Sequence, residues 1–152
     1  MWREEFSNEL PFYGHRNWIL VVDKAFPLQS SAGISYICSG EEIEDALEFV
    51  LESVNAASHV KPIIYTDKEL TVLSQIGEEE AQMVEKLDSI LKNYEVNSLL
   101  HDEIFKKMDE ASKMFNVMII KTESNIAYSS IFIELDCGYW NGEKEAKLRE
   151  LL

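Results

Sequence analysis

The chain has 152 residues and carries 28 acidic side chains against 14 basic ones, which gives a formal net charge of −14. A chain of this length typically forms one domain, and its 46% of hydrophobic residues suffice for a buried core. We therefore expect a single globular domain over residues 1–152. The strong negative charge would repel nucleic-acid phosphates and anionic lipids, so we expect neither as a partner.

Several functional classes are excluded by missing signals. No segment approaches the roughly 18 apolar residues of a membrane span, and Met1–Glu5 lacks the basic and then apolar order of a secretion signal. These features predict a cytoplasmic protein. Cys38 and Cys137 lack the paired spacing of a zinc or redox site, so we expect two buried, unreactive thiols and no metal site. The common nucleotide-binding, zinc-protease and serine-hydrolase motifs are also missing.

Apolar residues at helical spacing predict three long amphipathic helices. In the clearest of them Ile43, Leu47 and Val54 fall on one face of a 3.6-residue period. The two ends of the chain have weaker patterns that favour short helices. We expect helices over 41–57, about 78–94, about 102–114, within 2–13 and over 143–152, the last in a C-terminal tail that spans 139–152.

Short apolar runs separate these helices. Strand-length runs that alternate with helices are typical of a buried parallel sheet whose strands are joined through helices. We therefore predict an α/β fold with three layers and a mainly parallel sheet. Its strands are expected at 18–22, 63–65, 99–100, 115–120 and 131–135.

The segment from Gly14 to Pro27 carries the strongest functional signal. Its apolar strand runs into Asp23, and open α/β sheets place their ligands at the carboxyl ends of strands. His15 precedes the same strand. The two side chains could meet only if a loop carried His15 back or if a neighbouring subunit supplied it.

This segment resembles the first motif of the D-ribose pyranase and L-fucose mutarotase family (RbsD/FucU). The family pattern is a Gly-His pair, an Asp or Asn two positions after the histidine, an apolar strand, and an Asp followed by a Leu- or Phe-Pro pair. The chain supplies Gly14-His15, Asn17, Ile19–Val22, Asp23 and Phe26-Pro27 in the same register. A second family mark, Tyr-x-Asn before an apolar strand, is matched in part by Tyr128-Ser129-Ser130.

The resemblance implies an isomerase that interconverts the anomers or ring forms of a free reducing sugar, of the L-fucose or D-ribose type, with no metal or organic cofactor. It also implies a ring-forming subunit that assembles into a homo-oligomer, a pentamer or a decamer. Histidine suits the proton transfers because its unperturbed pKa is about 6.5. The residues carried over are His15, Asp23 and Tyr128 as catalytic groups, and Asn17, Ser130 and His101 as sugar-binding groups.

Two alternatives remain open. Ser130 stands in place of the family's asparagine, and Lys24 in place of a small residue, so the chain could be a sugar-binding or regulatory homologue without catalysis. It could also be an interaction protein on an acidic scaffold. Taken without the resemblance, His15 suits a loop, Asp23 a turn, and His101 a surface or helix-capping position.

Overall fold

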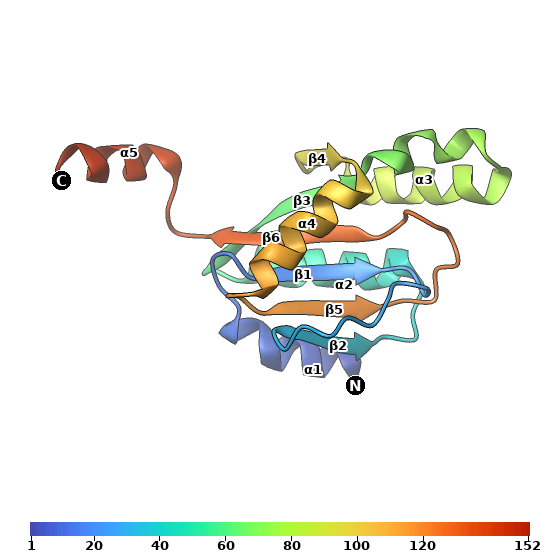
Figure 1. Ribbon diagram of the computed structural model, residues 1–152, viewed down its shortest axis with the longest axis horizontal. Coiled ribbons are helices and arrows are strands. Elements are labelled where there is room, and N and C mark those ends of the chain that lie inside the picture. The colour runs from blue at the N-terminus through green and yellow to red at the C-terminus, as the bar shows by residue number, and fades with distance from the viewer.

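The computed structural model describes all 152 residues and contains one six-stranded sheet with helices on both faces (Figure 1). The helices are α1 (Trp2–Glu9), α2 (Ile43–Ala56), α3 (Glu78–Leu91), α4 (His101–Ser112) and α5 (Gly142–Glu150), with 3₁₀ segments η1 (Leu10–Phe12) and η2 (Lys68–Gln75). The strands are β1 (Trp18–Val22), β2 (Ile34–Cys38), β3 (Val60–Asp67), β4 (Val96–Leu99), β5 (Val117–Lys121) and β6 (Ile131–Cys137).

The strand order is β2-β5-β1-β6-β3-β4. β1 pairs with β5, β5 with β2, and β3 with β4 in parallel, whereas β6 runs antiparallel to both β1 and β3. The prediction of a mainly parallel sheet is therefore confirmed, with β6 as the one reversed strand. Because β6 is reversed, its start lies at the same edge of the sheet as the ends of β1 and β3.

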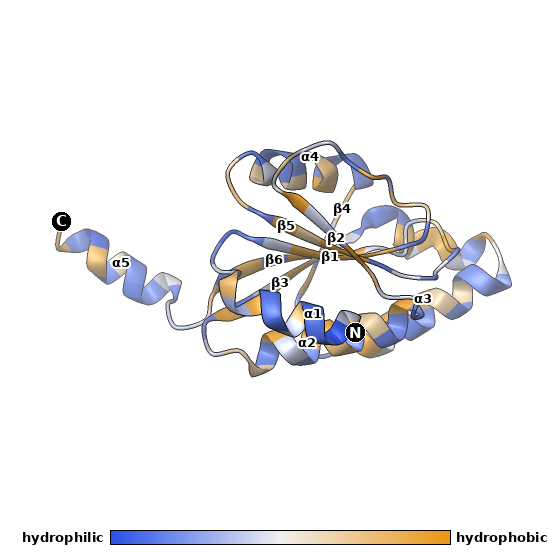
Figure 2. Ribbon diagram, turned by 90° about the horizontal axis from the view of Figure 1, so that it is seen from below, coloured by the Kyte–Doolittle hydropathy of each residue, from blue (hydrophilic) through white to orange (hydrophobic).

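The sheet separates two hydrophobic cores. Helices α1, α2 and α3 cover one face and α4 covers the other, as the view along the sheet shows (Figure 2). Alternate residues of β1 enter the two cores: Ile19 and Val21 pack with α1 to α3, and Trp18, Leu20 and Val22 pack with α4. The three-layer prediction is confirmed.

The central position of β1 explains its composition. Every residue of the strand is buried, because β5 and β6 flank it and helices cover both faces. A strand buried on both faces is continuously apolar rather than alternating. The rigid strand fixes the position of Asp23, which follows directly after it.

The structure corrects several details. The predicted helices are present with small shifts at their ends, and the strand predicted at 99–100 is β4, which begins earlier. Strand β2 was not predicted, because it is an edge strand with only one buried residue, Ile37. The prediction of two buried thiols is wrong: Cys38 is exposed, and Cys137 is half-buried.

Helix α5 extends away from the body of the molecule (Figure 1). None of its residues is buried. Asn141 caps its first turn by accepting a hydrogen bond from the backbone N–H of Lys144 at 2.8 Å. The predicted tail helix is confirmed. No helix in the chain has the length and apolar composition needed to span a membrane.

Candidate functional site

Asp23 and Ser130 form the first part of the site. In the antiparallel pair of β1 and β6, Val21 lies opposite Ile131, so Asp23 and Ser130 meet just beyond the paired residues. The Ser130 hydroxyl donates to Asp23 Oδ1 at 2.6 Å and accepts from the Asp23 backbone N–H at 3.0 Å. Asp23 is half-buried. We call this edge of the sheet the Asp23 end.

The loop after β1 is held by its neighbours. Lys121, the last residue of β5, donates from Nζ to the carbonyl oxygens of Lys24 at 2.7 Å and Phe26 at 2.6 Å. The side chain of Lys24 forms an ion pair with Glu123. These contacts give the loop a defined course, and they occupy both lysines.

Asp67 and His101 form the second part of the site. β3 and β4 are parallel neighbours in which Asp67 lies beside Leu99, so the last residue of β3 approaches the first residue of α4. His101 Nδ1 lies 2.9 Å from Asp67 Oδ2. The Asp67 side chain is completely buried, whereas that of His101 is 31% exposed.

Sequence reasoning missed Asp67. The one signal that could have found it is its position at the end of a strand, the same position that drew attention to Asp23. The segment Asp67-Lys68-Glu69 reads as an ordinary charged loop, and nothing local in it indicates a contact with His101. The structure therefore adds one acidic residue to the predicted set.

Burial raises the pKa of Asp67 to about 6. The hydrogen bond and the charge of His101 oppose this rise, and the negative charges of Glu69 and Asp23 add to it. Asp67 Oδ1 is buried and has no hydrogen-bond partner.

Tyr128 borders the same site. Its ring meets that of His101 edge-on, with centroids 5.5 Å apart, and the side chain is 39% exposed. Its backbone has φ of 61°, a left-handed conformation that a residue with a bulky side chain rarely adopts and that is often found at functional sites. The ring of Phe105 also packs against the imidazole of His101, with centroids 4.8 Å apart.

His15 lies at the opposite edge of the sheet, which we call the His15 end. The strand between it and Asp23 spans about 13 Å at roughly 3.3 Å per residue, so one subunit does not bring the two side chains together. His15 Nδ1 instead lies 3.3 Å from Asp136 Oδ1, and its side chain is 56% exposed. The neighbouring Arg16 has φ of 76°.

Asn17 also lies at the His15 end. Its Oδ1 accepts from the backbone N–H of Gly14 at 2.7 Å, and its Nδ2 donates to the carbonyl of Asn116 at 3.1 Å. Both ends of the amide are thus used within the chain. Asn17 holds the turn that carries His15, and the structure does not place it with Asp23.

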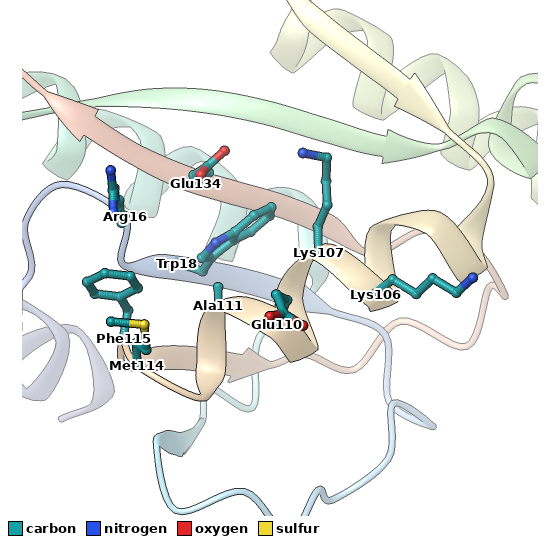
Figure 3. Close-up of a pocket in the computed structure, with 9 residues that line it drawn as sticks. All are labelled: Arg16, Trp18, Lys106, Lys107, Glu110, Ala111, Met114, Phe115 and Glu134. Atoms are coloured by element: carbon teal, nitrogen blue, oxygen red, sulfur yellow. The ribbon is translucent and has the colours of Figure 1, made fainter.

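Two of the recesses in the surface of the molecule lie toward the His15 end. One, of about 600 Å³, opens between α4 and the start of β1 (Figure 3). Figure 3 shows Trp18 in its wall and Lys107 extending from α4 beside it, and none of the predicted site residues lines the recess. The other, of about 510 Å³, lies between β6 and α5 and is lined by His15, Asp136 and Trp140, among others.

The charge at the Asp23 end is negative. Three carboxylates, those of Asp23, Asp67 and Glu69, lie at or beside the site. The nearby Lys24 and Lys121 are engaged in an ion pair and in carbonyl contacts. No group of three His, Cys, Asp or Glu side chains in the chain is arranged to hold a metal ion. The site thus offers oxygens that accept hydrogen bonds, an imidazole and a phenol, which together suit a neutral polyhydroxyl ligand.

Comparison with solved structures places this geometry in a known fold. RbsD of Bacillus subtilis in complex with D-ribose matches with a TM-score of 0.64 and 15% identity, over 90% of this chain and 93% of that chain. The fucose mutarotase of Streptococcus pneumoniae in complex with L-fucose matches with a TM-score of 0.57 and 16% identity, over 86% and 89%. FucU of Bifidobacterium longum matches with a TM-score of 0.58 and 13% identity, over 86% and 92%.

Comparison of sequences alone finds no relative. No protein-family model matches the chain, and no curated protein matches it either. At 12–16% identity the neighbours are evidence for the fold. The resemblance noted in Gly14–Pro27 thus agrees with the architecture of the whole chain, and the protein has the fold of RbsD and FucU.

Proposed function

We propose that the protein is a mutarotase or pyranase that interconverts the anomers or ring forms of a free monosaccharide. One observation carries the proposal: Asp23, Tyr128, Ser130 and His101, all expected from sequence, converge at one end of a sheet. They do so in a fold shared with proteins whose structures contain D-ribose and L-fucose.

The chemistry needs two proton-transfer groups and no electron transfer. One group takes the proton of the anomeric hydroxyl while the bond between the anomeric carbon and the ring oxygen breaks, and a second group gives a proton to the ring oxygen. The open aldehyde then closes on its other face, and both protons return. Histidine can serve either step near neutral pH.

The individual residues suit different parts of this reaction. Asp23 can accept hydrogen bonds from sugar hydroxyls through Oδ2, since Ser130 engages Oδ1. The Tyr128 hydroxyl is both a donor and an acceptor, and its ring offers an apolar surface to the sugar. In this proposal His101 binds the sugar, and Ser130 acts by holding Asp23.

His15 enters the site from a neighbouring subunit in this proposal. It is exposed at the His15 end, on a turn braced by Asn17, and is therefore available to a second copy. A site shared in this way makes the active protein a homo-oligomer, and the resemblance to the RbsD/FucU family implies a pentamer or a decamer. In an oligomer with closed symmetry, every subunit would receive His15 from one neighbour.

The activity is tested by saturation-transfer NMR, which measures the exchange between α and β anomers directly. We expect the wild-type protein to accelerate exchange of at least one sugar in a panel that includes D-ribose and L-fucose. The variant His15→Ala should slow that exchange by about 10²- to 10⁴-fold, the usual contribution of a proton-transfer group. Circular dichroism and light scattering control for folding and assembly.

The shared site is tested by mixing two inactive variants. His15→Ala and Asp23→Asn damage different residues, so mixed oligomers contain some sites with both native residues if each site draws on two subunits. Random mixing would restore up to about a quarter of the sites. Homogeneous oligomers of either variant serve as controls, and a mixture as inactive as its components would contradict the shared site.

The alternative function is sugar binding without catalysis. It is favoured by the Ser130 hydroxyl, which is engaged with Asp23, and by the distance of His15 from Asp23 within one subunit. The same NMR panel separates the two. A wild-type protein that binds a sugar but accelerates the exchange of none would support the alternative and contradict the mutarotase.

A further inference from the structure

His101 is held at two points by acidic side chains. Glu69 accepts the backbone N–H of His101 through Oε1 at 3.0 Å and Oε2 at 3.4 Å, which fixes the start of α4. Asp67 engages the ring at Nδ1 at 2.9 Å. Phe105 and Tyr128 then limit the rotation of the imidazole. A side chain that served only as a surface group would not need this many constraints.

Asp67 is unusual within this chain. The other polar residues of the buried set are Ser and Thr, so Asp67 is its only acidic, basic or histidine side chain. Burial of a carboxylate is unfavourable unless partners compensate for lost hydration. Here only Oδ2 has a partner, and Oδ1 has none. An apolar residue at this position would therefore give a more stable fold. This indicates that the carboxylate has a role other than stabilising the fold.

The second nitrogen of the imidazole is free. His101 Nε2 makes no hydrogen bond within the chain, while the side chain is 31% exposed. A carboxylate at Nδ1 requires the ring to donate from that nitrogen, and the contact on one ring nitrogen determines which tautomer is present. The remaining nitrogen, Nε2, then carries the lone pair.

We propose that Asp67 is a positioning residue, which holds His101 as the Nδ1–H tautomer and so makes Nε2 a proton acceptor at the Asp23 end. Its role in turnover rests on the proposed mutarotase activity. In that reaction Nε2 takes the proton from the anomeric hydroxyl as the ring bond breaks, and the protonated His15 of a neighbouring subunit gives its proton to the ring oxygen. Both protons return on closure. Asp67 stabilises the imidazolium between these steps without touching the sugar.

The groups around the pair support this direction of transfer. Burial raises the pKa of Asp67, the hydrogen bond and charge of His101 lower it, and the negative charges of Glu69 and Asp23 raise it further. These charges also favour a positive charge on the ring while the sugar is open. Above the resulting pKa of about 6 for Asp67, the carboxylate is ionised and the arrangement is complete.

The tautomer is tested without any activity. The chain has three histidines, so ¹⁵N-labelled histidine gives a simple imidazole spectrum. His59 is an internal reference, because its Nε2 lies 2.9 Å from the carbonyl of Tyr13 and must donate to it. At pH 7.5 we expect the Nδ1–H pattern for His101 and the Nε2–H pattern for His59. A His101 signal with the Nε2–H pattern in the wild-type protein would overturn the proposal, whatever the variants do.

The kinetic test compares two carboxylates next to the same histidine. Asp67→Asn removes the charge and keeps the shape, and Asp102→Asn makes the same change at an exposed neighbour of His101. We expect Asp67→Asn to lower kcat at least tenfold with a small change in KM, and to move the low-pH limb of the kcat profile by at least half a pH unit. Asp102→Asn should keep kcat within about twofold.

The outcomes separate the two proposals. If the wild-type protein exchanges anomers and Asp67→Asn keeps both its kcat and its pH profile, the positioning role is wrong and the mutarotase stands. If no sugar exchanges and the spectrum shows the Nδ1–H tautomer, which Asp67→Asn abolishes, the mutarotase is wrong and the role of Asp67 toward His101 stands.

Discussion

Ser130 holds Asp23 by two hydrogen bonds across 107 positions of sequence, one to the carboxylate and one to the backbone. The contact joins the start of β6 to the end of β1 and leaves one carboxylate oxygen for a ligand. A serine is long enough here because its own strand already lies beside Asp23. Ser130 is shorter than the asparagine of the family motif, and it contacts the Asp23 carboxylate rather than a more distant ligand atom.

Ser130→Ala should therefore weaken sugar binding. We expect about tenfold lower affinity, because Asp23 loses its orientation, and a loss of about 1 kcal/mol in the free energy of unfolding from the buried hydrogen bonds. Calorimetry and urea unfolding measure the two effects. Ser129→Ala is the matched control: Ser129 is equally buried and bonded to the Ile126 carbonyl at 2.7 Å, so it should lose similar stability and keep its affinity. Equal affinity losses in both variants would contradict the special role of Ser130.

The charge of the site predicts discrimination against phosphorylated sugars. Asp23, Asp67 and Glu69 are acidic, and the nearby Lys24 and Lys121 are engaged. We expect D-ribose 5-phosphate to bind at least tenfold more weakly than D-ribose at low ionic strength, because a phosphate dianion would be repelled. Calorimetry at two salt concentrations checks this, since screening should narrow the difference. Tighter binding of the phosphate would indicate a cation that the subunit alone does not supply.

The parts of the fold predicted from sequence are those with strong local signals. Strand β1 was predicted with its correct bounds, because a strand buried on both faces is a continuous apolar run. Strand β2 was missed, since an edge strand with alternating exposure is poorly marked. The antiparallel pairing of β6 could not be read from its own residues, because strand direction depends on the course of the whole chain.

The residues of the site also divide into those that local sequence signals predicted and those that they did not. Asp23, Tyr128 and Ser130 were expected from the resemblance of two short motifs to the RbsD/FucU family, and the structure brings them together with His101. Asp67 was not found, because its contact with His101 depends on the pairing of β3 with β4. For His15 the sequence left open a return by a loop or a supply by a neighbour, and the structure excludes the first within one subunit.

Arg16 provides a test of the turn that carries His15. Its φ of 76° is in the left-handed region, which costs a residue with a side chain roughly 1 kcal/mol. The guanidinium lies 5.8 Å from the centre of the Phe115 ring, a contact that contributes about 0.5 kcal/mol at an exposed site. Arg16→Gly should therefore be about 0.5 kcal/mol more stable than the wild type in urea unfolding. Arg16→Ala loses the contact and keeps the strain, so it should be less stable than both, and the reverse order would contradict the strain.

The raised pKa of Asp67 makes stability depend on pH. Burial raises the folded-state pKa from 3.8 to about 6, so the folded protein holds this proton more tightly than the unfolded chain. The stabilisation from this proton is fully present below about pH 4 and is lost as the pH rises to about 6, at up to about 1.4 kcal/mol per pH unit. An asparagine at this position has no proton to lose.

Asp67→Asn should therefore gain stability relative to the wild type as the pH rises. We compare the free energy of unfolding of Asp67→Asn with that of the wild type. Between pH 5.0 and pH 7.5, which covers the part of the titration above pH 5, this difference should shift in favour of the variant by about 1 kcal/mol. Urea unfolding at the two pH values measures it. Asp102→Asn, which neutralises an exposed carboxylate beside His101, should show no such change. A difference for Asp67→Asn that stays constant with pH would mean that the carboxylate is ionised throughout this range, and that His101 offsets its burial completely.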